Sequence, residues 1–443
     1  MQEKMTEKKL KLERWKEVGY SVRVHALKNK QRNTLIAMRV AEKCHEDTFR
    51  DGGEPYIIHP LMVAKTLILL KLEEELSKWY PHMNKDEIRY QCDVLYAAAM
   101  LHDVLEDCDI TPEQLLKYGL DKEVVEVVLL LTKKRKGSSS KKTNDVYFSG
   151  ILTNRNAVLI KIADRENNCS TMEVFEEKRM KRYIYETIEL FYPLCSKAKE
   201  LYPEISNAIT IMKNSIVAIC ETIATLLNLQ DAIVDEENNY QRTFRFIEEY
   251  SRNQMPNTHK ALYLANQLHE GQTRSSGDPF IIHPLRVCSY LISLGIDDDV
   301  LCAAMLLHEV PKMCKLEKNG MELVENYNLD REVIELVWKI PKQVGASLEE
   351  YYEELKTHWR TILGRLSNRA HTCTGLASLS YEEKKAYIQE TREQLVPMCR
   401  YAVTRYPQYV NRIDIMESHI STICNIVEVL VKKQQSTSKE EAD

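Results

Sequence analysis

The chain contains little of what β-rich folds, disulfide scaffolds or membrane spans require. Glycine and proline, the usual punctuation of sheets and turns, occur only 13 times each in 443 residues. No uninterrupted apolar run reaches the length of a membrane span, and the charged start MQEKMTEKKLKLERWKE lacks the apolar centre of a secretory signal. The 12 cysteines form no C-x-x-C pair and lie mostly in apolar segments, as reduced thiols do. We therefore expect a helical cytoplasmic protein without a membrane partner.

The charge balance excludes a general affinity for polyanions. The formal net charge is -5 and the sequence pI is about 6.2, so the protein as a whole offers no electrostatic attraction to nucleic acid. Any phosphate binding must therefore depend on a local site.

The sequence is a duplication. AMRVAEKCHEDTFRDGGEPYIIHPLMVAKTLI, which starts at Ala37, runs almost in step with ALYLANQLHEGQTRSSGDPFIIHPLRVCSYLI, which starts at Ala261. Further on, LYAAAMLHDV pairs with LCAAMLLHEV, and YIYETIELFYPLCSKAKELYP pairs with YIQETREQLVPMCRYAVTRYP, with Tyr183 and Tyr387 204 positions apart. A repeat of this length indicates two folded units of the same kind.

Apolar residues recur mostly at helical spacing, which predicts an all-α fold. The duplication then divides the chain into a charged N-terminal extension (1–29), a first repeat (30–228), a connector (229–255), a second repeat (256–432) and a polar tail expected to be disordered (433–443). We expect the two repeats to pack as an intramolecular pseudo-dimer. Association into a homo-oligomer stays open.

Four ionisable residues interrupt the apolar segment AAAMLHDVLEDCDI of the first repeat. His102 and Glu106 are four positions apart, as are Asp103 and Asp107, so each pair shares one face if the segment is a helix. Burying such groups without partners would cost several kcal/mol, which a bound cation, mutual hydrogen bonds or water access would avoid.

Two further candidate ligands each lie at or near the end of an apolar stretch. His59 occurs in YIIHP and Asp164 in VLIKIADRENN. Imidazoles and carboxylates without thiolates form a mixed nitrogen and oxygen set that suits Mn, Fe, Zn or Mg in a catalytic rather than a structural site. Taken alone, each of these residues is more often a hydrogen-bonded core residue than a ligand.

Together, the strings HEDTFRDGGEPYIIHP, AAAMLHDVLED, LTKKRK and KIADRENN resemble the HD-superfamily hydrolase domain of RelA/SpoT-type enzymes, which degrade the alarmones ppGpp and pppGpp. The resemblance covers most of the first repeat and implies two tandem HD-type domains, the first of which removes the 3′-pyrophosphate. A single Mn ion would be held by His59, His102, Asp103 and Asp164. Glu106 and Asp107 would position or activate water, Arg50 would pack on the guanine base and Asn168 would lie beside the ribose.

Some residues depart from the family pattern and leave the substrate open. Asp51 and Ser170 stand where the family usually has basic residues, so positive charge is missing near the expected polyphosphate. Lys133 and its loop could replace it, or the loop could be merely solvated; its basic residues are Lys133, Lys134, Arg135, Lys136, Lys141 and Lys142. Another phosphorylated nucleotide (ppApp, NADPH or a nucleoside monophosphate) and a non-catalytic nucleotide sensor are the alternatives. Nothing resembles a synthetase region.

The second repeat keeps the outline of the site but loses catalytic groups. Arg274 and His283 are retained, whereas His308 is followed by Glu309, and Asn368 replaces Asp164. The positions of Glu106 and Asp107 are taken by a lysine and a methionine. We therefore expect no hydrolysis there, and either a structural partner or a regulatory nucleotide site.

Overall fold

The computed structural model describes residues 16–133, 141–232, 237–274, 279–313 and 327–440. Within these ranges all regular secondary structure is helical, and no strand occurs apart from two isolated bridges, Phe49 with Pro55 and Thr273 with Pro279. It divides into two compact units, Met1–Cys220 and Glu221–Asp443. The all-α prediction is confirmed, and the two bridges mark the same turn in each repeat.

The first unit contains a helix at 16–28, followed by the elements α2 (Arg32–Cys44), α3 (Ile58–Leu69), α4 (Leu72–Trp79), α5 (Lys85–Leu101), α6 (Val104–Asp107), α7 (Pro112–Lys117), α8 (Lys122–Leu131), α9 (Lys141–Ile151), α10 (Arg155–Cys169), η1 (Met172–Val174), α11 (Glu177–Glu186), η2 (Thr187–Phe191), α12 (Tyr192–Leu201), η3 (Pro203–Ile205) and α13 (Ser206–Leu226), which continues into the second unit.

The remaining elements of the second unit are η4 (Gln230–Ala232), α14 (Glu237–Ser251), α15 (Pro256–Leu268), α16 (Ile282–Ser293), α17 (Asp299–Leu307), α18 (Val310–Met313), α20 (Arg331–Lys339), α21 (Leu348–Leu355), α22 (Trp359–Thr372), η5 (Cys373–Ser378), α23 (Tyr381–Glu390), η6 (Thr391–Leu395), α24 (Val396–Arg405), η7 (Pro407–Tyr409) and α25 (Val410–Glu440). The order of the site-bearing helices α2, α3, α5 and α10 recurs as α15, α16, α17 and α22.

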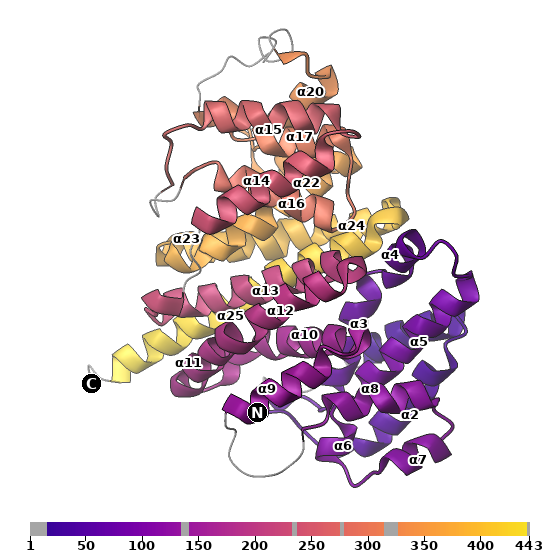
Figure 1. Cartoon of the computed structure of the whole chain (residues 1–443). Helices are drawn as coiled ribbons and strands as arrows, with labels where there is room; N and C mark the ends of the chain where they lie inside the picture. The colour runs from indigo at the N-terminus through magenta and orange to yellow at the C-terminus, as the bar shows by residue number, and fades with distance from the viewer. Residues whose placement is uncertain (1–15, 134–140, 233–236, 275–278, 314–326, 441–443) are drawn as a thin grey trace. The chain divides into compact units, whose positions relative to one another are not determined.

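The core of the first unit is built around α5. Helices α2, α3 and α8 pack against it, and α10 packs against both α3 and α8 (Figure 1). The second half of α5 is buried on all sides from Val94 to Leu101, as expected for a central helix whose sequence is apolar all round. This packing brings the end of α5 close to α3 and α10, the helices that carry the other candidate ligands.

A carboxylate distant in sequence caps the start of α2. Asp93, buried in α5, accepts hydrogen bonds from the backbone N–H groups of Asn33 and Thr34, both at 2.8 Å, and from the Thr34 hydroxyl at 2.7 Å. Asp299 accepts the same kinds of backbone bond at the start of α15 in the second unit. Because the first N–H groups of a helix have no partner within it, this contact ties the start of one helix to the middle or start of another.

Both units contain a π-helical turn before a proline. The turns are η2 and η6, and Pro193 and Pro397 follow in the first turn of α12 and α24. A proline inside a helix lacks an N–H donor and crowds the carbonyl four residues earlier, and a local π turn accommodates both effects. Next to each turn an arginine from the ligand-bearing helix, Arg165 or Arg369, bonds a threonine hydroxyl.

Helices occur in three segments that were expected to lie outside the two repeats. The N-terminal extension includes the helix at 16–28, whose Val22 and Ala26 are fully buried. The connector 229–255 contains α14, whose Ile247 is fully buried. Helix α25 continues to Glu440, through much of the polar tail, because that segment is rich in residues with good helix propensity.

One stretch, Pro203–Leu226, is long and apolar enough to cross a membrane, judged by length and composition alone. Inside the protein, 61% of its apolar window is buried, as in the core helix of a globular unit.

Candidate active site

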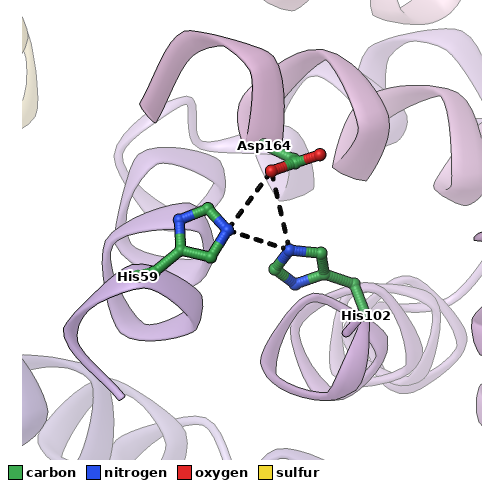
Figure 2. A group of neighbouring side chains, drawn as sticks. All are labelled: His59, His102 and Asp164. Carbon is green, nitrogen blue, oxygen red and sulfur yellow. Dashed lines mark hydrogen bonds and ion pairs between the residues drawn. The ribbon is translucent and has the colours of Figure 1, made fainter. Parts of the chain in front are cut away.

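Three buried side chains from separate helices converge in the first unit. His59 comes from the first turn of α3, His102 follows the last residue of α5, and Asp164 lies in α10 (Figure 2). The two Nε2 atoms are 3.1 Å apart, and the Asp164 Oδ1 atom lies 3.2 Å from Nε2 of His59 and 3.7 Å from Nε2 of His102. The Oδ2 atom of Asp103 joins them, 3.1 Å from Nε2 of His102 and 3.5 Å from that of His59. The structure therefore brings together all four side chains chosen as ligands.

A break in the helix lets consecutive residues face the same point. The sequence suggests that His102, Asp103, Glu106 and Asp107 could lie on one continuous helix, but α5 ends at Leu101 and α6 is a single turn that begins at Val104. On an unbroken helix neighbouring side chains point about 100° apart. The break removes that constraint, so the imidazole of His102 and the carboxylate of Asp103 meet at the same centre.

The hydrogen bonds of the imidazoles orient both rings toward a common centre. Nδ1 of His102 lies 2.8 Å from the Ala99 carbonyl, and Nδ1 of His59 lies 2.6 Å from Oδ1 of Asn167. Both partners accept hydrogen bonds, so each Nδ1 donates and each ring turns Nε2 toward the centre, where a lone pair on Nε2 is available to a metal ion. The two Nε2 atoms lie 3.1 Å apart and 3.1–3.7 Å from one oxygen of each carboxylate, the separations expected of atoms that share a metal ion at about 2.1 Å. The residues fit a divalent ion.

The charges around the site also favour positive charge at its centre. Burial of the His102 imidazole disfavours its protonation, yet the carboxylates of Asp103 and Asp164 outweigh burial and raise its pKa to about 10. Burial also disfavours ionised Asp103, but the adjacent His102 holds the pKa of that carboxyl well below its usual range. For Asp164 the opposing group is Lys161, whose Nζ lies 2.8 Å from Oδ2 and lowers the pKa of the acid despite burial. The centre thus stabilises positive charge while both carboxylates stay ionised.

Glu106 and Asp107, the candidate catalytic acids, lie on the turn beside these ligands. The Glu106 carboxylate accepts the backbone N–H of Lys133 at 2.5 Å, and burial raises its pKa above the ordinary value. The hydroxyl of Tyr56 contacts two carboxylates, Oδ2 of Asp103 at 2.8 Å and Oδ2 of Asp107 at 3.0 Å. Sequence reasoning missed Tyr56, although its replacement by Phe280 in the second repeat was a visible signal.

Arg50 and Asn168, chosen as substrate-binding residues, belong to a network around the ligands. Arg50 donates to Oδ1 of Asn168 at 2.5 Å and to Oδ1 of Asn167 at 3.3 Å. Asn168 donates in turn to Oδ1 of Asp164 at 2.6 Å, and Asn167 accepts from His59. The network fixes the orientation of two candidate ligands, a task that sequence reasoning did not give to Asn167.

The basic residues expected near the site are described only in part. Lys133 lies over the ring of Tyr147, 5.1 Å from its centroid, and burial lowers its pKa. Of the other loop residues, Lys134, Arg135 and Lys136 lie outside the described residues, and Lys141 and Lys142 begin α9. Asp51 forms an ion pair with Arg179 of α11 at 2.5 Å, so a positively charged side chain lies beside this acidic residue.

The corresponding residues of the second unit also approach one another. Nε2 of His283 and Nε2 of His308 are 3.2 Å apart, and Oε1 of Glu309 lies 3.6 Å from the latter. Asn368 is buried, and among the described residues its Oδ1 atom has no hydrogen-bond partner. Arg274 is half-buried, and its charge is among those that lower the pKa of His283, after burial and the neighbouring histidines.

The fold and the paired sites define a tandem HD protein. The HD domain family matches residues 37–199 and again 261–403, so the chain belongs to this family and carries its domain twice. Similar proteins include a guanosine-3′,5′-bis(diphosphate) 3′-pyrophosphohydrolase of Vibrio cholerae, 33% identical over 164 residues, which are 36% of this chain and 20% of the relative. The corresponding enzyme of Aquifex aeolicus is 32% identical over 164 residues, 36% of this chain and 21% of the relative.

A third similar protein is the bifunctional (p)ppGpp synthase/hydrolase SpoT of Escherichia coli strain K12. It is 31% identical over 153 residues, 33% of this chain and 22% of the relative. The chain therefore spans only about a fifth of the length of the curated relatives that it matches.

Proposed function

We propose that the first repeat is a metal-dependent pyrophosphohydrolase that removes the 3′-pyrophosphate of ppGpp- or pppGpp-type nucleotides, with GDP or GTP and pyrophosphate as products. The observation that carries the proposal is the convergence of four ligand atoms from His59, His102, Asp103 and Asp164 beside the carboxylates of Glu106 and Asp107. The names of the similar proteins supply the substrate class.

The proposed cofactor is one Mn ion, held by His59, His102, Asp103 and Asp164, although the ligand set would also accept other divalent metals. When bound, the ion lowers the pKa of water and neutralises charge that develops on the phosphate. The chain's own residues supply the proton transfer. Glu106, oriented by the Lys133 N–H and with a raised pKa, is placed to accept the proton of the attacking water. The new bond joins the water oxygen to the phosphorus that is attached to the ribose 3′-oxygen. The bond between that phosphorus and the 3′-oxygen breaks, and the proton held by Glu106 returns to the 3′-oxygen to give the 3′-hydroxyl of GDP or GTP.

Substrate binding is assigned to Arg50, Lys133 and Asn168. Arg50 lies at the edge of the network and offers a planar guanidinium on which a guanine base could stack. Lys133 is close enough to Glu106 for its ammonium group to meet a phosphate near the reacting atoms. Asn168 donates a hydrogen bond to Asp164, and its amide would lie beside the ribose.

A second candidate function keeps the metal site and changes the substrate to ppApp, NADPH or a nucleoside monophosphate. The observation in its favour is that Asp51 and Ser170 leave two positions near the site without positive charge of their own, and Ser170 is bonded to the Asn167 carbonyl at 2.8 Å. A nucleotide sensor without turnover is the remaining alternative.

Purified full-length protein with Mn should be incubated with ppGpp, ppApp, NADPH and nucleoside monophosphates, and released pyrophosphate and phosphate measured separately. We expect pyrophosphate from ppGpp, and a loss of at least about 10³-fold in Asp103→Asn because a ligand is removed. The matched control is Asp109→Asn, an exposed carboxylate two residues beyond α6, which should keep wild-type activity. Phosphate from NADPH with none from ppGpp would favour the second candidate, and no turnover of any substrate would refute hydrolysis.

A further inference from the structure

The second repeat keeps a compact group of possible metal ligands despite its substitutions. His283 from α16, His308 from the end of α17 and Glu309 offer ligand atoms that all lie within 4.8 Å of one another. Both imidazoles are almost completely buried, with exposed fractions of 3% and 1%. The two Nε2 atoms are 3.2 Å apart, nearly the same distance as in the first repeat, 3.1 Å.

A fourth possible ligand is the amide of Asn368. This residue occupies the position on α22 that Asp164 occupies on α10, 204 positions earlier. Only 8% of its surface is exposed. Its Oδ1 atom is buried and accepts no hydrogen bond from the residues that the structure describes. A buried carbonyl oxygen without a donor costs roughly 1–3 kcal/mol, and coordination of a divalent ion would satisfy it.

The histidine protons decide whether this centre needs an ion. Nδ1 of His308 lies 2.7 Å from the Met305 carbonyl and must donate to it, so Nε2 of the neutral ring carries a lone pair. Nδ1 of His283 lies 2.9 Å from Nδ1 of His371, and either ring can donate. If His283 donates, its Nε2 lone pair faces that of His308 and a cation must lie between them. If His371 donates, His283 passes its other N–H to His308 and no ion is needed.

His371 stands where the first repeat has Asn167, whose carbonyl oxygen permits only the arrangement that requires a cation. The substitution therefore does not remove metal binding but gives the pair of imidazoles an alternative hydrogen-bonded arrangement. We infer that the second repeat binds one divalent transition-metal ion through His283, His308, Glu309 and the amide oxygen of Asn368. The set has two imidazoles, one carboxylate and one neutral oxygen, which favours zinc-like borderline ions over manganese.

This ion would not support hydrolysis. Phe280 replaces Tyr56 and therefore has no hydroxyl to orient a carboxylate, and the exposed Lys312 replaces Glu106. The second repeat therefore has a lysine where the first has the proton acceptor Glu106. The second centre is a metal site that stabilises the meeting of α16, α17 and α22, whatever the first repeat hydrolyses.

The test is the metal content of the full-length chain. Chelator-treated protein is reloaded with Zn, freed of excess ion and analysed by elemental mass spectrometry, with circular dichroism to check the fold. We expect about two ions per chain in the wild type, about one in His102→Ala, about one in His308→Ala and none in the double variant. The absorption bands of cobalt in the His102→Ala background should indicate coordination by nitrogen and oxygen, and disappear when His308 is also replaced.

A further variant keeps every proposed ligand and therefore does not depend on the alanine variants folding. In the otherwise wild-type chain His371→Asn restores a fixed acceptor for His283, so the zinc ion of the second site should bind about tenfold more tightly. A folded His102→Ala chain that retains no zinc, or zinc retained after both histidines are replaced, would overturn the inference. So would an unchanged affinity in His371→Asn. Because the readout is bound metal, a failure to hydrolyse ppGpp leaves the result interpretable.

Discussion

The hydroxyl of Tyr56 provides a sharp test of how the first site works. It lies 2.8 Å from the proposed metal ligand Asp103 and 3.0 Å from the catalytic candidate Asp107. A phenol has a single proton to donate, so Tyr56→Phe removes the equivalent of one hydrogen bond to a charged group, worth about 1.5–3 kcal/mol. If that bond is fully formed in the transition state, kcat/KM should fall by about 10–100-fold.

The same substitution should leave other properties nearly unchanged. Tyr56→Phe keeps the ring that stacks on His45, with centroids 4.6 Å apart, so the melting temperature should change little. The loss should appear in kcat and in the Mn dissociation constant more than in KM for the nucleotide, because the hydroxyl contacts carboxylates rather than the proposed nucleotide-binding residues. Steady-state kinetics and metal titration measure these quantities.

A matched control is Tyr118→Phe, which alters an exposed tyrosine of the same unit. It should retain wild-type kinetics. If Tyr56→Phe also retains kcat/KM and Mn affinity within about twofold, the bond to Asp103 contributes nothing to the chemistry and the role given to Tyr56 is wrong.

Two further predictions concern stability. Asp93→Asn keeps the shape of the side chain but replaces a carboxylate that accepts several bonds, so the free energy of unfolding of the first unit should fall by about 2–4 kcal/mol, measured in urea; the exposed Asp86→Asn is the control, and an equal loss in both would contradict the capping role. Burial lowers the pKa of His419 from 6.5 to about 4. Between pH 6.5 and pH 4 the unfolded chain binds a proton at this ring more readily than the folded chain. The free energy of unfolding therefore keeps its full value above pH 6.5 and falls by about 3 kcal/mol as the pH falls toward 4. His419→Gln should reduce the difference in unfolding free energy between pH 7 and pH 4, and an unchanged difference would refute the assignment.

Much of the architecture could be predicted because the duplication is direct evidence. The spacing of 204 residues aligns Tyr183 with Tyr387, and the helical order that it implies recurs in both units. The candidate ligands could also be predicted from the sequence, since histidines and aspartates at the ends of apolar stretches need partners when buried. What the spacing did not reveal is the break between α5 and α6, because the apolar pattern continues across His102 and Asp103 without a proline or glycine.

Contacts between distant side chains were the other part that sequence reasoning could not supply. Asn167 is unremarkable in sequence, yet its amide oxygen fixes the tautomer of His59, 108 positions earlier. The Arg50 side chain, expected to pack on a guanine base, also donates a hydrogen bond to Asn168, a contact that no sequence pattern indicates. Such bonds depend on how α3 and α10 pack, which no local pattern encodes.

The π turns before Pro193 and Pro397 have a consequence for the history of the protein. Unusual helical turns of this type often accompany catalytic or binding sites, and η2 viewed alone would suggest a part in the proposed chemistry. Yet η6 lies at the same place in a repeat that lacks the tyrosine and the acidic pair, and its arginine contacts match. The simplest history is that one ancestral gene already had this turn before it was copied. Its preservation through divergence then reflects a demand of the scaffold, shared by both halves, rather than a demand of the chemistry proposed for one.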